Sequence, residues 1–178
     1  MQVEPLTCLQ SRQFCSKLPK RLDCHDLRWC EVYMERILVI CTGNAARSQI
    51  AEGLFRSLGK DEVEIHSAGT HPAGFIHPLA IETMLERGID ITEQKSKSFS
   101  IYEGQRFDYV ITVCDDAQQE CPAFRGASHQ LHWSIPDPSF HPGSEEECME
   151  AFRLTIVSLE RRITTFLEDL KNGKAASE

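Results

Sequence analysis

A cysteine and an arginine stand six residues apart in the segment CTGNAARS, which covers residues 41–48. Small residues fill most of the space between Cys41 and Arg47, so the backbone can turn tightly and point successive N–H groups at one centre. Gly43 and Asn44 are residue types that readily adopt the unusual backbone angles of such a turn. A guanidinium at Arg47 can donate two parallel hydrogen bonds to an oxyanion, and a helix that begins here adds its positive end. The segment therefore predicts thiol chemistry on a tetrahedral oxyanion, with Cys41 as a nucleophile of lowered pKa.

The other residues of the segment are expected to bind the oxyanion, mainly through backbone N–H groups. They are Thr42, Gly43, Asn44, Ala45, Ala46 and Ser48. A nucleotide-binding P-loop is excluded, because its lysine and its spacing are absent. The alternative is a buried cysteine that merely ends a strand, with Arg47 as a surface charge.

Two further cysteines, Cys114 and Cys121, stand seven residues apart. In a helix they would lie about two turns, or roughly 10 Å, apart, which is too far for a disulfide bond unless the segment unwinds. Polar residues between them and Pro122 after them favour such unwinding. The alternative is one core cysteine and one incidental surface cysteine. Cys148, early in the last predicted helix, is interpreted as a packing or surface residue.

Strand and helix patterns alternate along the chain. Short apolar or alternating runs predict four strands, at residues 37–40, 63–68, 107–113 and 130–135. Helices are predicted at residues 48–58, from Pro78 to near Gly88, and after a Ser144–Glu147 capping box as far as Leu170.

This alternation predicts a doubly wound α/β fold, in which a four-stranded parallel sheet is flanked by helices. Ligands of such sheets bind beyond the carboxyl ends of the strands. Three chemically distinctive residues, Cys41, Cys114 and Asp137, follow predicted strand ends. We therefore expect the fold to bring them together.

The composition restricts the class of protein. The chain has 178 residues, of which 41% are apolar, and a formal net charge of −8, so it predicts one domain and no general nucleic-acid partner. No apolar run approaches the roughly 18–20 residues of a membrane span, and a secretory signal is not recognisable, so a cytoplasmic protein without a membrane partner is expected.

Residues 1–35 are interpreted as an irregular N-terminal extension, residues 36–170 as the domain, and residues 171–178 as a tail. In a reducing compartment the eight cysteines are not expected to form a disulfide framework.

The segment ILVICTGNAARSQIAEG, residues 37–53, resembles the opening of the low-molecular-weight protein tyrosine phosphatase superfamily, specifically its thioredoxin-coupled arsenate reductase branch. The likeness covers residues 36–170. It continues through Ser67-Ala68-Gly69, Gly88-Ile89-Asp90, the Cys114 segment, and His132-Trp133 to Asp137-Pro138. The resemblance implies a low-molecular-weight phosphatase-like fold and the reduction of arsenate to arsenite.

The resemblance also implies an order of events. Cys41 would attack arsenic while Asp137 protonates the departing oxygen, and Arg47 would bind the oxyanion. Cys114 would then attack the Cys41 sulfur and release arsenite, and Cys121 would attack Cys114 in turn. Thioredoxin or glutaredoxin would reduce the final disulfide, and no cofactor or metal is required.

Several residues depart from relatives. Ala46 stands where many relatives carry a further cysteine. Some relatives bind potassium near the anion loop, and Asn44, Glu52 and Ser67 match that site, but Gln94-Lys95-Ser96-Lys97 brings lysines to it. We therefore doubt a need for potassium and expect the ammonium group of Lys97 or Lys95 to replace the ion.

Two other functions are alternatives. A phosphotyrosine phosphatase would use the same Cys41, Arg47 and Asp137. Gln49, however, stands where those phosphatases commonly have a proline after Arg-Ser, and Ser139 with Phe140 replaces the aromatic residue usually found directly after Asp-Pro. A noncatalytic redox or arsenite sensor would use the clustered thiols without turnover.

Overall fold

The computed structural model of the protein describes residues 34–120 and 124–173. The predicted N-terminal extension up to residue 33, the relay residue Cys121 and the end of the predicted tail lie outside these described residues. Everything below concerns the described part of the chain.

A four-stranded parallel sheet forms the centre of the fold. Its strands are β1 (Glu35–Cys41), β2 (Val63–Gly69), β3 (Phe107–Thr112) and β4 (Ala127–His132). The spatial order is β2-β1-β3-β4, and each neighbouring pair is parallel. β1 is therefore central, and its residues 37–40 are fully buried because both faces of the sheet are covered. The predicted fold class is confirmed.

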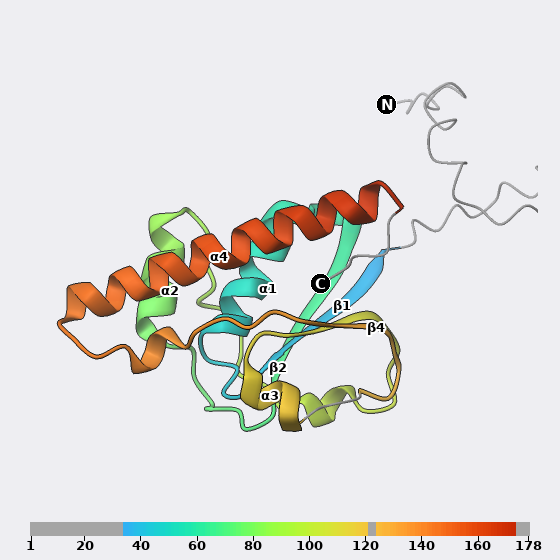
Figure 1. Ribbon diagram of the computed structural model, residues 1–178, viewed down its shortest axis with the longest axis horizontal. Coiled ribbons are helices and arrows are strands. Elements are labelled where there is room, and N and C mark those ends of the chain that lie inside the picture. The colour runs from blue at the N-terminus through green and yellow to red at the C-terminus, as the bar shows by residue number, and fades with distance from the viewer. Residues whose placement is uncertain (1–33, 121–123, 174–178) are drawn as a thin grey trace, which may run out of the picture. The chain divides into compact units, whose positions relative to one another are not determined.

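Four α-helices accompany the sheet: α1 (Arg47–Gly59), α2 (Pro78–Glu86), α3 (Asp115–Glu120) and α4 (Glu145–Lys171). The described residues also form three short 3-10 helices: η3 (Lys60–Glu62), η4 (Phe99–Tyr102) and η5 (Pro138–Phe140). In Figure 1, α1, α2 and α4 lie together on one side of the sheet, and α3 lies on the other side. This arrangement places the starts of α1 and α3 directly after the carboxyl ends of β1 and β3.

The long helix α4 begins at the predicted capping box. The Ser144 hydroxyl accepts a hydrogen bond from the Glu147 N–H, and the Glu147 carboxylate accepts one from the Ser144 N–H. Its apolar stripe is buried against the sheet and α1, as a helical period predicts. The stripe consists of Phe152, Ile156, Leu159, Ile163, Phe166 and Leu167.

One predicted element, the fourth strand, is wrong in its bounds. β4 begins at Ala127 and ends at His132, three residues earlier than predicted, because its parallel register with β3 pairs Phe107 with Ala127 and Thr112 with His132. In α2 the buried residues are Ala80, Thr83 and Met84, whereas Leu85 is 48% exposed. The face of α2 is set by its contacts with α4 and α1 rather than by its largest apolar side chains.

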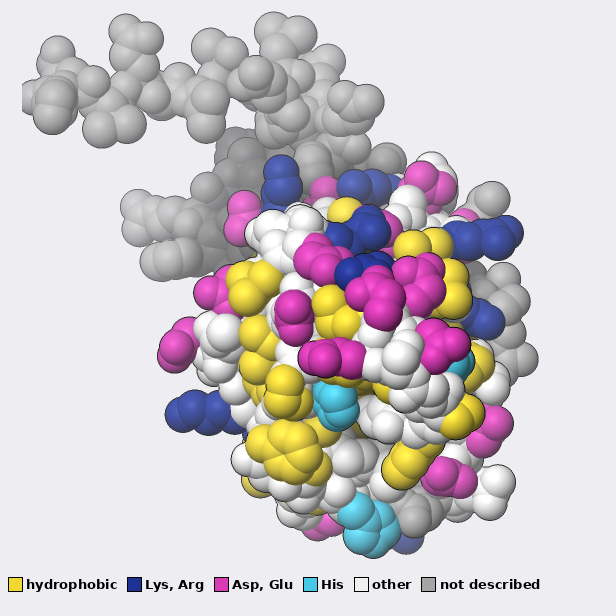
Figure 2. All heavy atoms as spheres, turned by 90° about the vertical axis from the view of Figure 1, so that its left-hand side faces the viewer, with side chains coloured by type: hydrophobic (Ala, Val, Ile, Leu, Met, Phe, Trp, Pro, Cys, Tyr) yellow, Lys and Arg dark blue, Asp and Glu magenta, His cyan; other side chains and the backbone are white. Residues whose placement is uncertain are grey.

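The surface shows the acidic balance of the composition. On the face at the left of Figure 1, acidic side chains are interspersed with basic and hydrophobic ones, and no extended basic patch is present (Figure 2). Among the helices of the described residues, none combines the length and the apolar character that a bilayer crossing requires.

Candidate active site

The anion loop, residues 41–48, joins β1 to α1 at the carboxyl edge of the sheet. Cys41 is the last residue of β1 and is buried. Its sulfur accepts a hydrogen bond from the Asn44 N–H, with 3.1 Å between N and Sγ, and lies 3.0 Å from the Ser48 hydroxyl oxygen. The loop thus folds around the Cys41 sulfur, as the segment CTGNAARS predicts.

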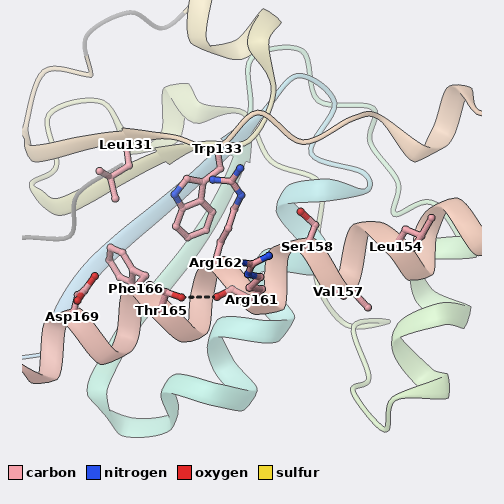
Figure 3. A pocket seen from close by; sticks show the side chains of 10 residues that line it. All are labelled: Leu131, Trp133, Leu154, Val157, Ser158, Arg161, Arg162, Thr165, Phe166 and Asp169. Carbon is pink, nitrogen blue, oxygen red and sulfur yellow. Dashed lines mark hydrogen bonds between the residues drawn. The ribbon is translucent and has the colours of Figure 1, made fainter.

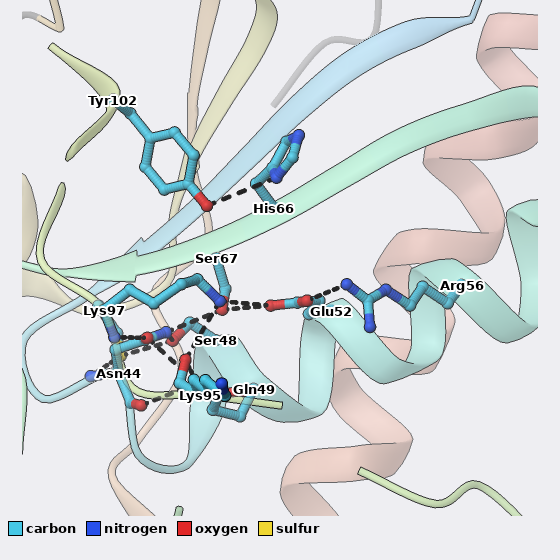
Figure 4. Close-up of polar contacts among 11 residues, drawn as sticks. Asn44, Ser48, Gln49, Glu52, Arg56, His66, Ser67, Lys95, Lys97 and Tyr102 are labelled. Carbon is cyan, nitrogen blue, oxygen red and sulfur yellow. Dashed lines mark hydrogen bonds and ion pairs between the residues drawn. The ribbon is translucent and has the colours of Figure 1, made fainter. Parts of the chain in front are cut away.

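Asn44 fixes the turn of this loop. It has a positive φ of 44°, and its buried amide donates to the hydroxyls of Ser48 and Ser67 at 2.8 and 2.9 Å. Its side-chain oxygen accepts from the Lys97 N–H at 2.7 Å (Figure 4). Gly43, by contrast, has no positive φ. The predicted positive φ therefore occurs at Asn44, where the side-chain hydrogen bonds stabilise it, and not at Gly43.

Gln49 is a supporting residue whose structural role the sequence analysis missed. It is fully buried, and its amide nitrogen lies 3.0 Å from the Asn44 carbonyl oxygen and 3.0 Å from that of Lys95. It thereby ties the anion loop to the segment before η4. The available signal was a polar residue inside the apolar face of α1.

The segment from Thr70 to His77 lines the outer side of the anion loop. Its N–H groups donate to the carbonyl oxygens of residues 41, 42, 43 and 45 at distances between 2.8 and 3.1 Å. Because these carbonyl groups point outward to that segment, the loop's N–H groups are free to point toward the centre where an oxyanion binds. The substrate-binding role predicted for Thr42, Gly43, Asn44, Ala45, Ala46 and Ser48 is compatible with this geometry.

Gly69 is the point where β2 approaches the anion loop most closely. A Cβ atom at this position would lie 2.6 Å from the Thr42 carbonyl oxygen and 3.0 Å from the Asn44 nitrogen. Gly69→Ala is therefore expected to destabilise the fold by about 1–3 kcal/mol and to weaken phosphate binding, because backbone atoms of the loop must move. Denaturant unfolding and phosphate titration measure the two effects.

A matched glycine provides the control for stability. A Cβ at Gly43 would meet its nearest atoms at 3.9 Å, which is ordinary contact. Gly43→Ala should therefore change the free energy of unfolding by less than about 0.5 kcal/mol. Equal destabilisation by the two substitutions would contradict the assigned role of the close approach at Gly69.

Arg47 and Asp137 meet beside the loop, although 90 residues separate them in the sequence. The buried guanidinium of Arg47 donates to the Ile135 carbonyl oxygen at 3.0 Å and forms an ion pair with the Asp137 carboxylate. The other carboxylate oxygen of Asp137 accepts from the Ser139 N–H at 3.0 Å. The Asp137 carboxylate therefore contacts Arg47 in the way that an oxyanion would.

The pKa of Cys41 moves in the direction opposite to the one predicted. Burial raises the pKa of its thiol, and the hydrogen bonds with Ser48 and the charge of Arg47 only partly oppose this rise. The guanidinium of Arg47 itself donates to the Ile135 carbonyl oxygen and pairs with the Asp137 carboxylate.

Cys114 is the second sulfur at this edge of the sheet. It is buried between β3 and α3, and its Sγ lies 3.4 Å from the hydroxyl of Thr42, the residue after Cys41. The Ala117 N–H in α3 also donates to this sulfur at 3.4 Å. The fold thus brings Cys114 to the anion loop, while Cys121 lies outside the described residues. Cys148 lies apart on α4, where its thiol donates to the His141 carbonyl oxygen.

Two hollows border α4. The first lies between the end of β4 and α4 and is lined by residues that include Trp133, Arg161 and Arg162 (Figure 3). The second includes Asp137 and the residues after it. No residue of the anion loop lines either of these two hollows, whereas Asp137 lines the second.

Comparisons with known proteins show the family of this chain. The model of the family "Low molecular weight phosphotyrosine protein phosphatase" matches residues 36–176. An arsenate reductase of Halalkalibacterium halodurans is 39% identical over 132 residues, which are 74% of this chain and 94% of that protein.

Solved structures show the same fold. An arsenate reductase in the phosphate-binding state superposes with a TM-score of 0.67 at 27% identity, over 76% of this chain and 98% of that one. The tyrosine phosphatase Wzb from Escherichia coli K30, in complex with sulphate, gives 0.64 at 26% identity, over 78% and 99%. The chain therefore belongs to the low-molecular-weight phosphotyrosine protein phosphatase family, in its arsenate reductase branch.

Proposed function

We propose that this protein is an enzyme that reduces arsenate to arsenite at the anion loop. The observation that carries the proposal is the presence of two buried sulfurs at one oxyanion-binding turn, where Cys114 contacts the hydroxyl of Thr42, the residue after Cys41. A phosphatase needs only the Cys41 sulfur, whereas a two-electron reduction needs a second thiol within reach of the first. The 39% identical relative from H. halodurans, an arsenate reductase, supports the same assignment.

The first step forms a bond between the Cys41 sulfur and arsenic. Arsenate binds to the loop N–H groups and replaces the Asp137 carboxylate at Arg47. Asp137, once protonated, donates its proton to the departing As–OH group, which leaves as water, and the Asp137 carboxylate takes up the proton that the Cys41 thiol loses. The product is a covalent Cys41–arsenic(V) adduct.

The second step is the reduction. The Cys114 sulfur attacks the Cys41 sulfur, an S–S bond forms, and the Cys41–arsenic bond breaks with its electron pair remaining on arsenic. Two thiols are thereby oxidised to one disulfide and arsenic(V) is reduced to arsenic(III), which leaves as arsenite. Attack of Cys121 on Cys114 then frees Cys41, and a cytoplasmic dithiol protein, thioredoxin or glutaredoxin, reduces the resulting disulfide.

Coupled turnover tests this proposal. The full chain, thioredoxin, thioredoxin reductase and NADPH are mixed with arsenate, and the oxidation of NADPH is followed together with arsenite formation. The proposal expects arsenite and oxidised NADPH in equal amounts over many turnovers. A protein that binds arsenite or changes its thiol state without arsenate turnover would be the sensor. Hydrolysis of phosphotyrosine without arsenite formation would identify the phosphatase.

Lys97 is proposed to take the place of a potassium ion behind the loop. Its ammonium group lies 3.5 Å from the buried Glu52 carboxylate and donates to the Lys95 carbonyl oxygen at 3.1 Å (Figure 4). Glu52 is 2% exposed and also contacts Arg56 and accepts from the Ser67 hydroxyl. These contacts favour Lys97 over Lys95 as the internal cation.

Arsenate turnover is therefore expected to be the same in potassium and sodium salts of equal ionic strength. Lys97→Met should lower the free energy of unfolding by about 1–3 kcal/mol, because it removes one of two cations from a buried carboxylate. Lys95→Met, which removes a more exposed ammonium group, is the matched control. Potassium-dependent turnover in the unsubstituted protein would contradict the proposal.

A further inference from the structure

One imidazole ring bridges the two sides of Cys114. The Nδ1 atom of His132, at the end of β4, lies 2.8 Å from the Thr112 hydroxyl at the end of β3. Its Nε2 atom lies 3.0 Å from the carboxylate of Asp115, the first residue of α3. Thr112 and Asp115 enclose Val113 and Cys114 in the chain. We call these three side chains, Thr112, His132 and Asp115, the imidazole clamp.

We propose that the imidazole clamp is a positioning device for the reduction step, which holds the Cys114 sulfur at the anion loop. This inference rests on the proposed function and assigns His132 and Asp115 as positioning residues. Neither side chain is part of the oxyanion-binding turn. Both act on the chemistry only through Cys114.

The hydrogen-bond chemistry of the clamp is consistent in either protonation state of the ring. A neutral His132 donates from Nε2 to the Asp115 carboxylate and accepts from the Thr112 hydroxyl at Nδ1. A protonated ring keeps the bond to the carboxylate with added charge, and the Thr112 hydroxyl then accepts from Nδ1. Hydrogen bonds from Ser134 and His132 lower the pKa of the Asp115 carboxyl, so its acceptor form is favoured.

The clamp has a mechanical reason to matter, because α3 is only six residues long. A helix of this length is not stable by itself and keeps its place through tertiary contacts. The contacts of the Cys114 sulfur with the Thr42 hydroxyl and the Ala117 N–H, both at 3.4 Å, are weak because a thiol sulfur is a weak donor and acceptor. The clamp therefore adds side-chain hydrogen bonds of 2.8 and 3.0 Å to the backbone hydrogen bonds, from Val113 to Ile40 at 2.9 Å and from Trp133 to Thr112 at 2.8 Å, that fix the turn containing Cys114.

A general structural role is a weaker explanation. The Asp115 side chain is 64% exposed, and exposed ion pairs contribute little to global stability. Reaction rates, however, depend steeply on the position of a nucleophile, and a displacement of about 1 Å can lower a rate on the order of 100-fold. The clamp should thus affect the rate of sulfur–sulfur bond formation much more than the free energy of unfolding.

Disulfide formation without arsenic tests the clamp directly. The full chain carrying Cys121→Ser is treated with diamide, a small thiol oxidant, and the Cys41–Cys114 disulfide is quantified by peptide mapping over time. Asp115→Ala and His132→Ala in this background should slow its formation on the order of 10-fold. Asp115→Asn retains an oxygen that accepts from His132 and should restore most of the rate. Asp116→Ala, which removes the same charge one residue later, is the matched control.

A second readout separates positioning from damage to the site. Hydrolysis of para-nitrophenyl phosphate uses Cys41, Arg47 and Asp137 but not Cys114, so the clamp variants should keep the unsubstituted rate. Unchanged disulfide formation in Asp115→Ala and His132→Ala would overturn the inference, and so would a parallel loss of hydrolysis. Because the diamide reaction contains no arsenate, a failure of arsenate turnover alone would sink the proposed function without altering this result.

Discussion

Cys114→Ser is expected to lower arsenite release in a single turnover by roughly 1,000-fold or more, because a hydroxyl cannot replace a sulfur nucleophile in disulfide formation. The Cys41 sulfur would still reach arsenic, so the reaction should stop at the arsenic(V) adduct. Rapid mixing with arsenate, followed by chromatographic separation of arsenite, measures this loss.

The same variant should retain its oxyanion chemistry. Para-nitrophenyl phosphate hydrolysis and phosphate affinity are expected to match the unsubstituted protein, since Cys114 is not a residue of the anion loop and contacts it through the Thr42 hydroxyl. Cys148→Ser, which removes the thiol on α4, is the matched control and should release arsenite normally. Normal arsenite release by Cys114→Ser would remove Cys114 from the reaction.

The second large effect is expected at Arg47. Arg47→Ala should lower both arsenite release and para-nitrophenyl phosphate hydrolysis by roughly 100- to 1,000-fold, because both transition states lose the donor that stabilises their oxyanion. Arg47→Lys should recover little, since an ammonium group lacks the planar fork that binds two oxygens. Initial-rate measurements with both substrates check these expectations.

Arg162→Ala is a matched control for this substitution, because it removes an exposed arginine from the hollow along α4. Its two activities should equal those of the unsubstituted protein. A loss of arsenite release without a loss of hydrolysis in Arg47→Ala would contradict a shared oxyanion site.

The sequence predicted the fold well where the pattern was local. Three local patterns each determine one element directly. They are the apolar run before Cys41, which forms β1, the proline at the start of α2, and the Ser144–Glu147 capping box at the start of α4. The parallel sheet followed from the alternation of strands and helices. The anion loop was predicted because its nucleophile, its turn residues and its arginine all lie in one continuous segment between a buried strand and a helix.

Features that depend on distant contacts could not be predicted. The ends of β4 follow its pairing with β3, and the raised pKa of the Cys41 thiol follows its burial in the folded chain. The imidazole clamp joins β3, β4 and α3 through His132. In the sequence, His132 stands out only as part of a stretch that resembles the family, and nothing there indicates its two partners. The roles of Cys41, Arg47, Cys114, Cys121 and Asp137 stay predictions, although four of them lie at or beside the anion loop.

The central claim is that electrons leave the protein through sulfur at one oxyanion-binding turn. Reduced full-length protein, mixed with arsenate in the absence of any reductant, tests it by parallel determination of arsenite, free thiols and disulfide-linked peptides. The account predicts one arsenite and the loss of two thiols per chain, with the disulfide linking Cys114 to Cys41 or to Cys121. Arsenite formation with all thiols intact, or disulfide formation that excludes Cys114, would contradict it.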